Sequence, residues 1–80
     1  MSERAKLRWR CRRGMKEVDV LLLGYLERHY DTAPAEERRL FADLLELQDP
    51  QLHAYLIGLE APADPAVARV IGKIRAAAHA

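Results

Sequence analysis

Helix-breaking residues divide this chain of 80 residues into five stretches. Gly14 separates the first two stretches, because glycine adopts the left-handed backbone conformation that ends many helices. Pro34, Pro50 and Pro65 stand where the later stretches begin. Proline is tolerated in a first helical turn, since its missing N–H would have no partner there. The positions of these helix-breaking residues predict five short helices with short connections.

Within the stretches, apolar residues recur at the three- and four-residue spacing of one helix face. In the second stretch the residues on this face are Val18, Leu21, Leu22, Tyr25, Leu26 and His29. Ser2, Asp49 and Asp64 precede helical stretches, and their side-chain oxygens can accept from free N–H groups as N-caps. The helices are expected at about residues 3–13, 15–30, 34–47, 50–58 and 65–77. No strand pattern competes, so the predicted fold is all-α: a compact five-helix bundle forming a single small domain over residues 1–80.

The size of the chain limits what it can do. A domain of this length buries only about 60–65% of its unfolded surface, so its core is thin. A deep active site is hard to build in such a domain, and we predict a binding protein with no catalytic residues. No segment approaches the roughly 20 apolar residues needed to cross a bilayer, so no membrane insertion is expected. The single Cys11 cannot form an internal disulfide, which favours the cytoplasm.

Residues that hold metals or cofactors in other proteins lack the required spacing here. Cys11, His29, His53 and His79 form no zinc signature, so no metal is predicted. No glycine-rich loop is present to bind the pyrophosphate of FAD, so no cofactor is expected to bind stably to this chain. His29 lies on the apolar face of its helix and is interpreted as a core histidine. Trp9, the only tryptophan, is interpreted as a partly buried anchor of the core.

The charges are unevenly distributed along the chain. Residues 1–14 contain six cationic residues and one acidic residue, a net charge of +5 that leaves −4 on residues 15–80. A basic end on an acidic body suggests electrostatic attraction to an anionic partner. Nucleic acid is one such partner, but the cations alternate along the first helix and no recognition motif accompanies them. We therefore favour a solvated basic helix and predict no nucleic-acid partner.

The segment from Cys11 to Glu17 contains the most distinctive group of polar residues. Arg13 ends one predicted helix and Glu17 lies in the first turn of the next, so each charge suits its helix dipole. That placement is a complete structural explanation. The functional alternative is an exposed polar turn, where an arginine binds a carboxylate or phosphate and Gly14 lets a partner's backbone approach closely.

Around this segment the sequence closely resembles the SdhE/YgfY family of FAD assembly factors. The family's hallmark, Arg-Gly-x-x-Glu, is present as Arg13-Gly14-Met15-Lys16-Glu17. Trp9, Cys11-Arg12 and Asp19 flank it, and the likeness continues through His29-Tyr30-Asp31, Glu37-Arg38-Arg39-Leu40-Phe41 and Asp49-Pro50-Gln51-Leu52. The resemblance covers about residues 4–75.

The resemblance implies an assembly factor, not an enzyme. Members of the family bind the flavoprotein subunit of succinate dehydrogenase or fumarate reductase and promote covalent attachment of FAD to it, so FAD acts through the partner. By analogy, Arg13, Gly14 and Glu17 contact the flavoprotein. Further candidates for the same surface are Arg12, Met15, Lys16 and Asp19. A monomer is expected. The alternative is an antitoxin-like or cytoskeleton-linked regulatory protein.

Overall fold

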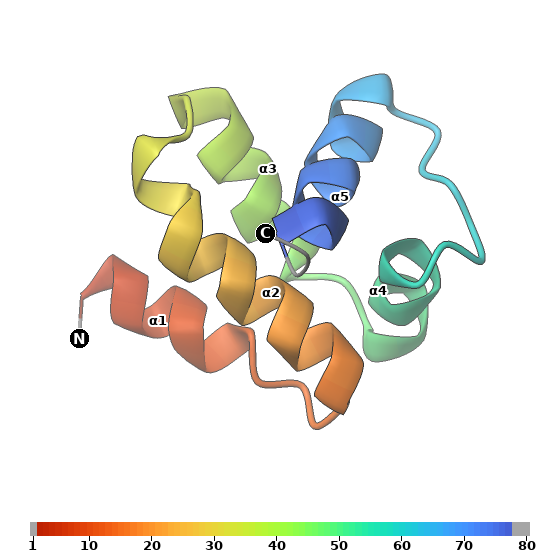
Figure 1. Cartoon of the computed structure of the whole chain (residues 1–80), viewed down its shortest axis with the longest axis horizontal. Helices are drawn as coiled ribbons and strands as arrows, with labels where there is room; N and C mark the ends of the chain where they lie inside the picture. Colours follow the sequence, from red (N-terminus) through yellow and green to blue (C-terminus); the bar gives the residue numbers. More distant parts are fainter. Residues whose placement is uncertain (1, 78–80) are drawn as a thin grey trace.

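The computed structural model describes residues 2–77 and contains five α-helices and one 3-10 turn in that range (Figure 1). The elements are α1 (Glu3–Arg10), α2 (Lys16–Arg28), η1 (Tyr30–Thr32), α3 (Ala35–Leu44), α4 (Asp49–Leu56) and α5 (Pro65–Ala77). No strand occurs within this described range. The predicted all-α bundle of five helices is therefore confirmed.

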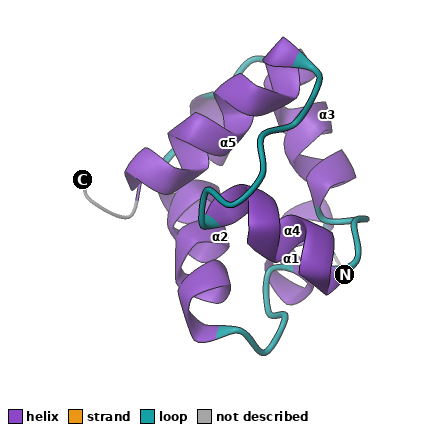
Figure 2. Ribbon diagram, turned by 90° about the vertical axis from the view of Figure 1, so that its right-hand side faces the viewer, coloured by secondary structure: helices purple, strands orange, loops and turns teal. Residues whose placement is uncertain are grey.

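Helix α2 lies at the centre of the bundle, and the other elements pack around it. It contacts α1, η1, α4 and α5 (Figures 1 and 2). Four α2 side chains are almost completely buried, namely Val18, Leu22, Tyr25 and Leu26. They follow the apolar spacing read from the sequence, so burial of this one stripe organises the core.

Two of the three predicted N-caps are confirmed. Ser2 Oγ accepts from the Ala5 N–H at 3.1 Å, and Asp64 Oδ1 accepts from the Ala66 N–H at 2.9 Å. The prediction for Asp49 is wrong. Helix α4 begins at Asp49 itself, with Gln48 in the cap position and no side-chain cap. The Asp49 carboxylate instead accepts from Arg13 Nε at 2.9 Å, an ion pair that local sequence cannot reveal.

Several helices end earlier than their apolar pattern predicts. Helix α1 was expected to reach residue 13 but ends at Arg10, because the N–H groups of Arg13 and Gly14 bond to Asp19 instead of to helix carbonyls. Helix α3 was expected over residues 34–47 but spans Ala35–Leu44. Helices α2 and α4, expected over 15–30 and 50–58, span Lys16–Arg28 and Asp49–Leu56. Ends are decided by such competing bonds more than by apolar spacing.

A partly buried polar contact joins α2, α3 and α5. Tyr25 is fully buried, and its hydroxyl donates to Glu37 at 2.6 Å, while Lys73 donates to the same carboxylate at 2.5 Å. Burial alone would raise the pKa of Glu37, but the hydrogen bonds from Lys73 and Tyr25 outweigh it and hold the pKa below its usual value. The ionised carboxylate is therefore part of the folded state.

Because the folded-state pKa of Glu37 is lowered, its contribution to stability is present above the ordinary pKa near 4.5 and is lost as the pH falls through the folded-state value. We expect wild type to exceed Glu37→Gln in free energy of unfolding at pH 7, and the difference to shrink below pH 4.5. Urea unfolding of both proteins between pH 7 and pH 3 measures this. A difference that stays constant over that range would contradict the charged role of Glu37.

Candidate partner-binding site

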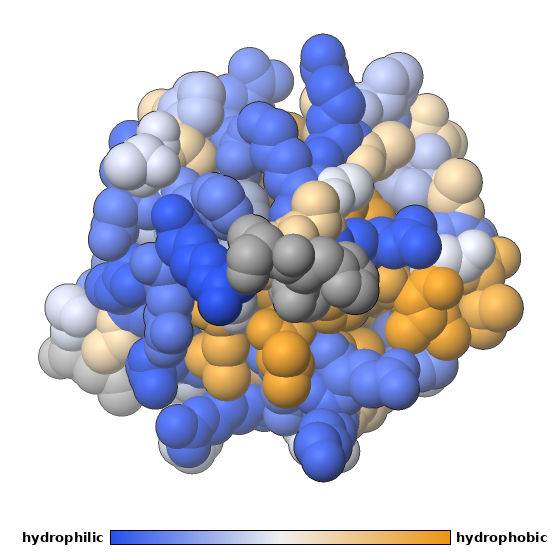
Figure 3. Space-filling model, viewed as in Figure 1, coloured by the Kyte–Doolittle hydropathy of each residue, from blue (hydrophilic) through white to orange (hydrophobic). Residues whose placement is uncertain are grey.

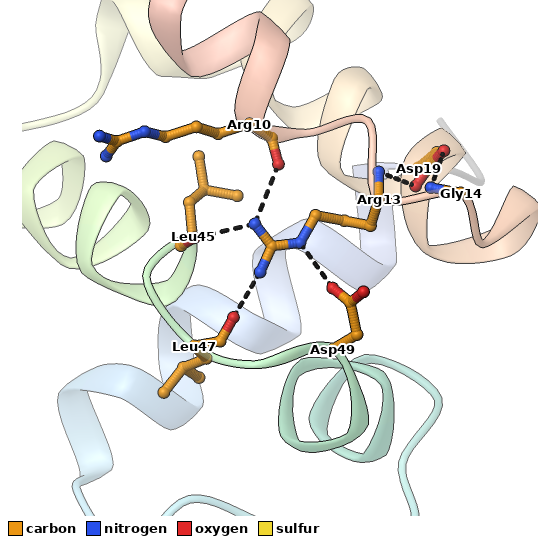
Figure 4. A network of polar contacts seen from close by, with 7 residues as sticks. All are labelled: Arg10, Arg13, Gly14, Asp19, Leu45, Leu47 and Asp49. Atoms are coloured by element: carbon orange, nitrogen blue, oxygen red, sulfur yellow. Dashed lines mark hydrogen bonds and ion pairs between the residues drawn. The ribbon is translucent and has the colours of Figure 1, made fainter.

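The turn between α1 and α2 is shaped by one carboxylate. Asp19, in the first turn of α2, accepts from the Arg13 N–H at 2.8 Å and from the Gly14 N–H at 3.2 Å (Figure 4). Gly14 has φ of +85°, a conformation that L-residues with a side chain rarely adopt. A Cβ at Gly14 would meet no atom within 4 Å, so the backbone conformation, not crowding within the chain, requires glycine here.

The Arg13 side chain points inward. Its guanidinium donates to Asp49 at 2.9 Å and to the carbonyl oxygens of Arg10 at 3.2 Å and Leu45 at 2.9 Å, and it also donates to the carbonyl oxygen of Leu47 (Figure 4). Only 15% of the side chain is exposed. Arg13 therefore fastens the end of α1 to the connection between α3 and α4.

The other predicted contact residues divide by exposure. Arg12, Gly14, Lys16 and Glu17 are exposed. The side chains of Arg12, Lys16 and Glu17 have no hydrogen bond or ion pair within residues 2–77. Met15 is half-buried and packs against the core, and Asp19 is half-buried beneath the turn. The structure therefore brings the seven predicted residues together at one turn, four of them facing outward. Which of them touch a partner stays a prediction.

Trp9 is a surface residue that the sequence interpretation placed wrongly. Its side chain is 73% exposed. Leu7 on α1 and Cys11 directly after it are buried and lie four residues apart on one face. Trp9 lies between them in sequence and therefore on the opposite side. Placing Leu7 and Cys11 on one stripe would have revealed this orientation. Tryptophan is a frequent anchor of protein interfaces, so Trp9 joins the candidate surface.

His29 is also exposed, so its interpretation as a core histidine is wrong. It follows the last residue of α2, where the helix has ended and the apolar stripe no longer faces the core. Its ring centroid lies 6.0 Å from that of Tyr25, at the edge of the buried cluster. Among the described residues, no group of three or more His, Cys, Asp or Glu side chains is placed to hold a metal. His79 lies outside the described residues.

Most of the basic charge near the N-terminus is paired within the molecule. Four arginines of this region form ion pairs with other elements, namely Arg4 with Asp31, Arg8 with Glu27, Arg10 with Glu46 and Arg13 with Asp49. Lys6 and Arg12 are the cations of residues 2–14 that have no such pair among the described residues. The attraction to an anionic partner expected from the sequence is therefore weaker than its net charge suggests.

Apolar side chains also reach the surface beyond this turn. Val20, on α2, is 57% exposed, and Leu59, just after α4, is 76% exposed. Figure 3 shows strongly apolar atoms over α4 and the neighbouring part of α2 on the face viewed. No helix among residues 2–77 is long and apolar enough to cross a membrane.

Cys11 is placed where a nucleophile would be ineffective. It is completely buried, and burial raises the pKa of its thiol to about 12. The reactive form is the thiolate. We expect iodoacetamide at pH 8 to alkylate the folded protein at least ~100-fold more slowly than the urea-unfolded protein. Mass spectrometry of timed samples measures both rates, and similar rates would show that α1 does not cover the thiol in solution.

Comparison with known proteins places this arrangement in a family. Residues 5–78 match the family described as the flavinator of succinate dehydrogenase. The FAD assembly factor SdhE of Methylococcus capsulatus is 47% identical over 76 residues, covering 95% of this chain and 92% of that protein. The FAD assembly factor SdhE of Shewanella oneidensis is 42% identical, covering 89% of this chain and 87% of that protein. The FAD assembly factor SdhE of Photobacterium profundum is also 42% identical, covering 91% of this chain and 83% of that protein. The chain is therefore a member of the FAD assembly factor SdhE family, the flavinators of succinate dehydrogenase.

Proposed function

We propose that this chain binds the flavoprotein subunit of succinate dehydrogenase and promotes covalent attachment of FAD to it. Its family membership supports this role. The structural observation that carries the proposal is the exposed turn after α1, where the side chains of Arg12, Lys16 and Glu17 have no hydrogen bond or ion pair within the described chain. We call Trp9, Arg12, Gly14, Lys16 and Glu17 the loop surface. An exposed turn with unpaired charges, next to an exposed tryptophan near the end of α1, has the composition of a protein-binding surface.

The residues of the turn divide between contact and positioning in this proposal. Glu17 and the neighbouring cations make polar contacts with the flavoprotein, and Gly14 allows its backbone to approach closely. Arg13 and Asp19 act as positioning residues, because their side chains bond to this chain's own carbonyl, carboxylate and N–H groups. Met15 helps to hold the turn against the core.

The proposed mechanism is selection of a flavoprotein conformation. Bond formation between FAD and a protein side chain requires the reacting groups to be held in place and the developing charge to be stabilised. An assembly factor can favour that arrangement only if it binds the attachment-competent conformation more tightly than the others. FAD is then held by the flavoprotein, and this chain supplies binding energy and no catalytic group.

The proposal extends to the setting in which the factor works. We infer that it acts as a monomer in the cytoplasm and that the flavoprotein subunit of fumarate reductase is a second client. The reduced, buried Cys11 is compatible with a reducing compartment. An antitoxin-like or cytoskeleton-linked role would instead require a different partner, which pull-down with the wild-type chain would identify.

The test of the proposed function is covalent flavin fluorescence of the succinate dehydrogenase flavoprotein on a denaturing gel. Cells lacking this gene are compared with cells that express wild type, Glu17→Ala or Glu36→Ala at matched levels. Glu36 is an exposed acid in the first turn of α3, outside the loop surface, and is the control. Loss of one partner from an interfacial charge pair costs about 2–5 kcal/mol, so we expect at least a tenfold weaker band with Glu17→Ala.

Wild type and Glu36→Ala should restore the band equally. A full band without the gene would overturn the proposed function itself. A full band with Glu17→Ala would remove Glu17 from the binding site and leave the function in place.

A further inference from the structure

One side of α3 carries a buried hydrogen-bond donor without an acceptor. The Nε atom of Arg38 is buried and has no hydrogen-bond partner among the described residues. The rest of its guanidinium forms no ion pair within that range either. An unpaired buried donor destabilises a fold, and such groups are rare in native proteins. Because none of these nitrogens has a partner there, the positive charge of Arg38 is not neutralised within the described chain.

Arg38 lines a cavity of about 310 Å³. The cavity lies between the beginning of α1, the η1 turn and the side of α3, and its lining residues are Glu3, Tyr30, Ala35, Arg38, Arg39 and Ala42. Two of its walls are fixed by contacts elsewhere. The Tyr30 ring packs on Phe41 with centroids 5.8 Å apart, and an ion pair of 2.8 Å between Arg4 and Asp31 ties α1 to the turn. The cavity is thus preformed.

Three charged side chains determine what this cavity can bind. Arg38 and Arg39 supply two guanidinium groups, and Arg39 is exposed with no ion pair within residues 2–77. Glu3 lines the same cavity, is exposed, and pairs with neither arginine. The net charge of the lining is therefore +1, which suits a single negative charge. A phosphate dianion would leave the cavity with a net charge of −1 and would lose more hydration on entering it.

We propose that this cavity binds a carboxylate group. The planar guanidinium presents paired N–H donors that match the two oxygens of a carboxylate, and a carboxylate in this cavity would neutralise the net positive charge of its lining. The source is a free small carboxylate or an acidic side chain of another protein, since the recognising chemistry is the same.

This site is separate from the loop surface. Glu3 begins α1 and the loop surface lies around its end, about 12 Å along an eight-residue helix. The two sites use no common residue. Carboxylate binding can therefore be lost without loss of flavinylation, and the two proposals are tested independently.

The test follows the Arg38 Nε–Hε signal of the ¹⁵N-labelled full chain by NMR, assigned by its loss in Arg38→Gln. Sodium acetate is titrated against sodium chloride at equal ionic strength. We expect a saturable shift with acetate alone and a dissociation constant on the order of 1–10 mM, the range of a single weak contact. Chloride producing the same shift, or no saturable shift with acetate, would overturn the proposal.

The next variants replace exposed residues, so that a change in acetate binding does not reflect unfolding of the chain. Arg39→Gln should weaken acetate binding at least ~3-fold, and Glu3→Gln should strengthen it about 2- to 5-fold by removing a like charge. Arg69→Gln removes an exposed arginine of α5 outside this cavity and should change nothing. Acetate binding unaffected by both Arg39→Gln and Glu3→Gln would place the ion elsewhere and contradict the assignment.

Two further titrants identify the anion and its source. Inorganic phosphate at pH 8 should bind more weakly than acetate, and tighter phosphate binding would overturn the choice of carboxylate. A blocked Gly-Asp-Gly peptide, with Gly-Asn-Gly as its control, is then compared with acetate. Tighter binding of the aspartate peptide assigns the site to a protein side chain, whereas tighter binding of acetate assigns it to a small molecule.

Discussion

Replacing Arg13 with alanine is expected to lower the melting temperature by roughly 10–25 °C. The substitution removes the ion pair to Asp49 and the hydrogen bonds to the carbonyl oxygens of Arg10, Leu45 and Leu47. Because only 15% of the Arg13 side chain is exposed, these bonds are largely shielded from water. Their loss leaves polar groups without partners and costs about 2–4 kcal/mol. Thermal unfolding followed by circular dichroism at 222 nm measures the change.

Arg12→Ala is the matched control for stability, because Arg12 is the adjacent arginine and is exposed without a partner in the described chain. Its effect should stay within about 4 °C of wild type. The melting temperature of Arg13→Lys should lie between those of the two alanine variants, because a single ammonium group cannot reach all the acceptors to which the guanidinium donates. Equal melting temperatures for Arg13→Ala and Arg12→Ala would return Arg13 to the partner-contact role that the sequence motif suggested.

The helices were predictable because their signals are local. Gly14 has the positive φ expected of a glycine in a turn, although α1 ends four residues before it, and Asp64 caps the helix that Pro65 begins. The buried stripe of α2 follows directly from apolar spacing, which depends on a few neighbouring residues. The end of α3 was not predictable in this way. The connection after Leu44 accepts hydrogen bonds from Arg13, more than 30 residues earlier in the chain.

The turn that carries the candidate residues was predictable, but the orientations of their side chains were not. Arg13, Gly14 and Glu17 lie around one turn, as the motif suggests, and their contact with a partner stays a prediction. Whether Arg13 points inward depends on Asp49 and on two carbonyl oxygens of another connection, and these contacts exist only in the folded chain. Trp9 was misplaced because hydrophobicity was given more weight than its position on the helix. On α1 the side opposite Leu7 faces away from the core.

Placing a side chain at Gly14 is expected to abolish flavinylation while the fold survives. No atom lies within 4 Å of a Cβ built at this position, so the bundle itself has room for one. The cost within the chain is conformational, because φ is +85°. Gly14→Val should therefore lower the free energy of unfolding by about 1–2 kcal/mol. It should also remove at least 90% of the covalent flavin signal, because overlap between the valine side chain and the flavoprotein would weaken binding by several kcal/mol.

Gly14→Asn separates the two roles that glycine can have at this turn. Asparagine adopts positive φ more readily than other residues with a side chain, so this variant should melt close to wild type. If Gly14 serves close approach to the flavoprotein, Gly14→Asn should still lose the flavin signal and fail to capture the flavoprotein in pull-down. Gly72→Asn, at an exposed helical glycine with open space around it, makes the same change elsewhere and should keep both. Normal flavinylation with Gly14→Asn would mean that glycine is needed only for the backbone conformation that Asp19 holds, and that Gly14 makes no close contact with the flavoprotein.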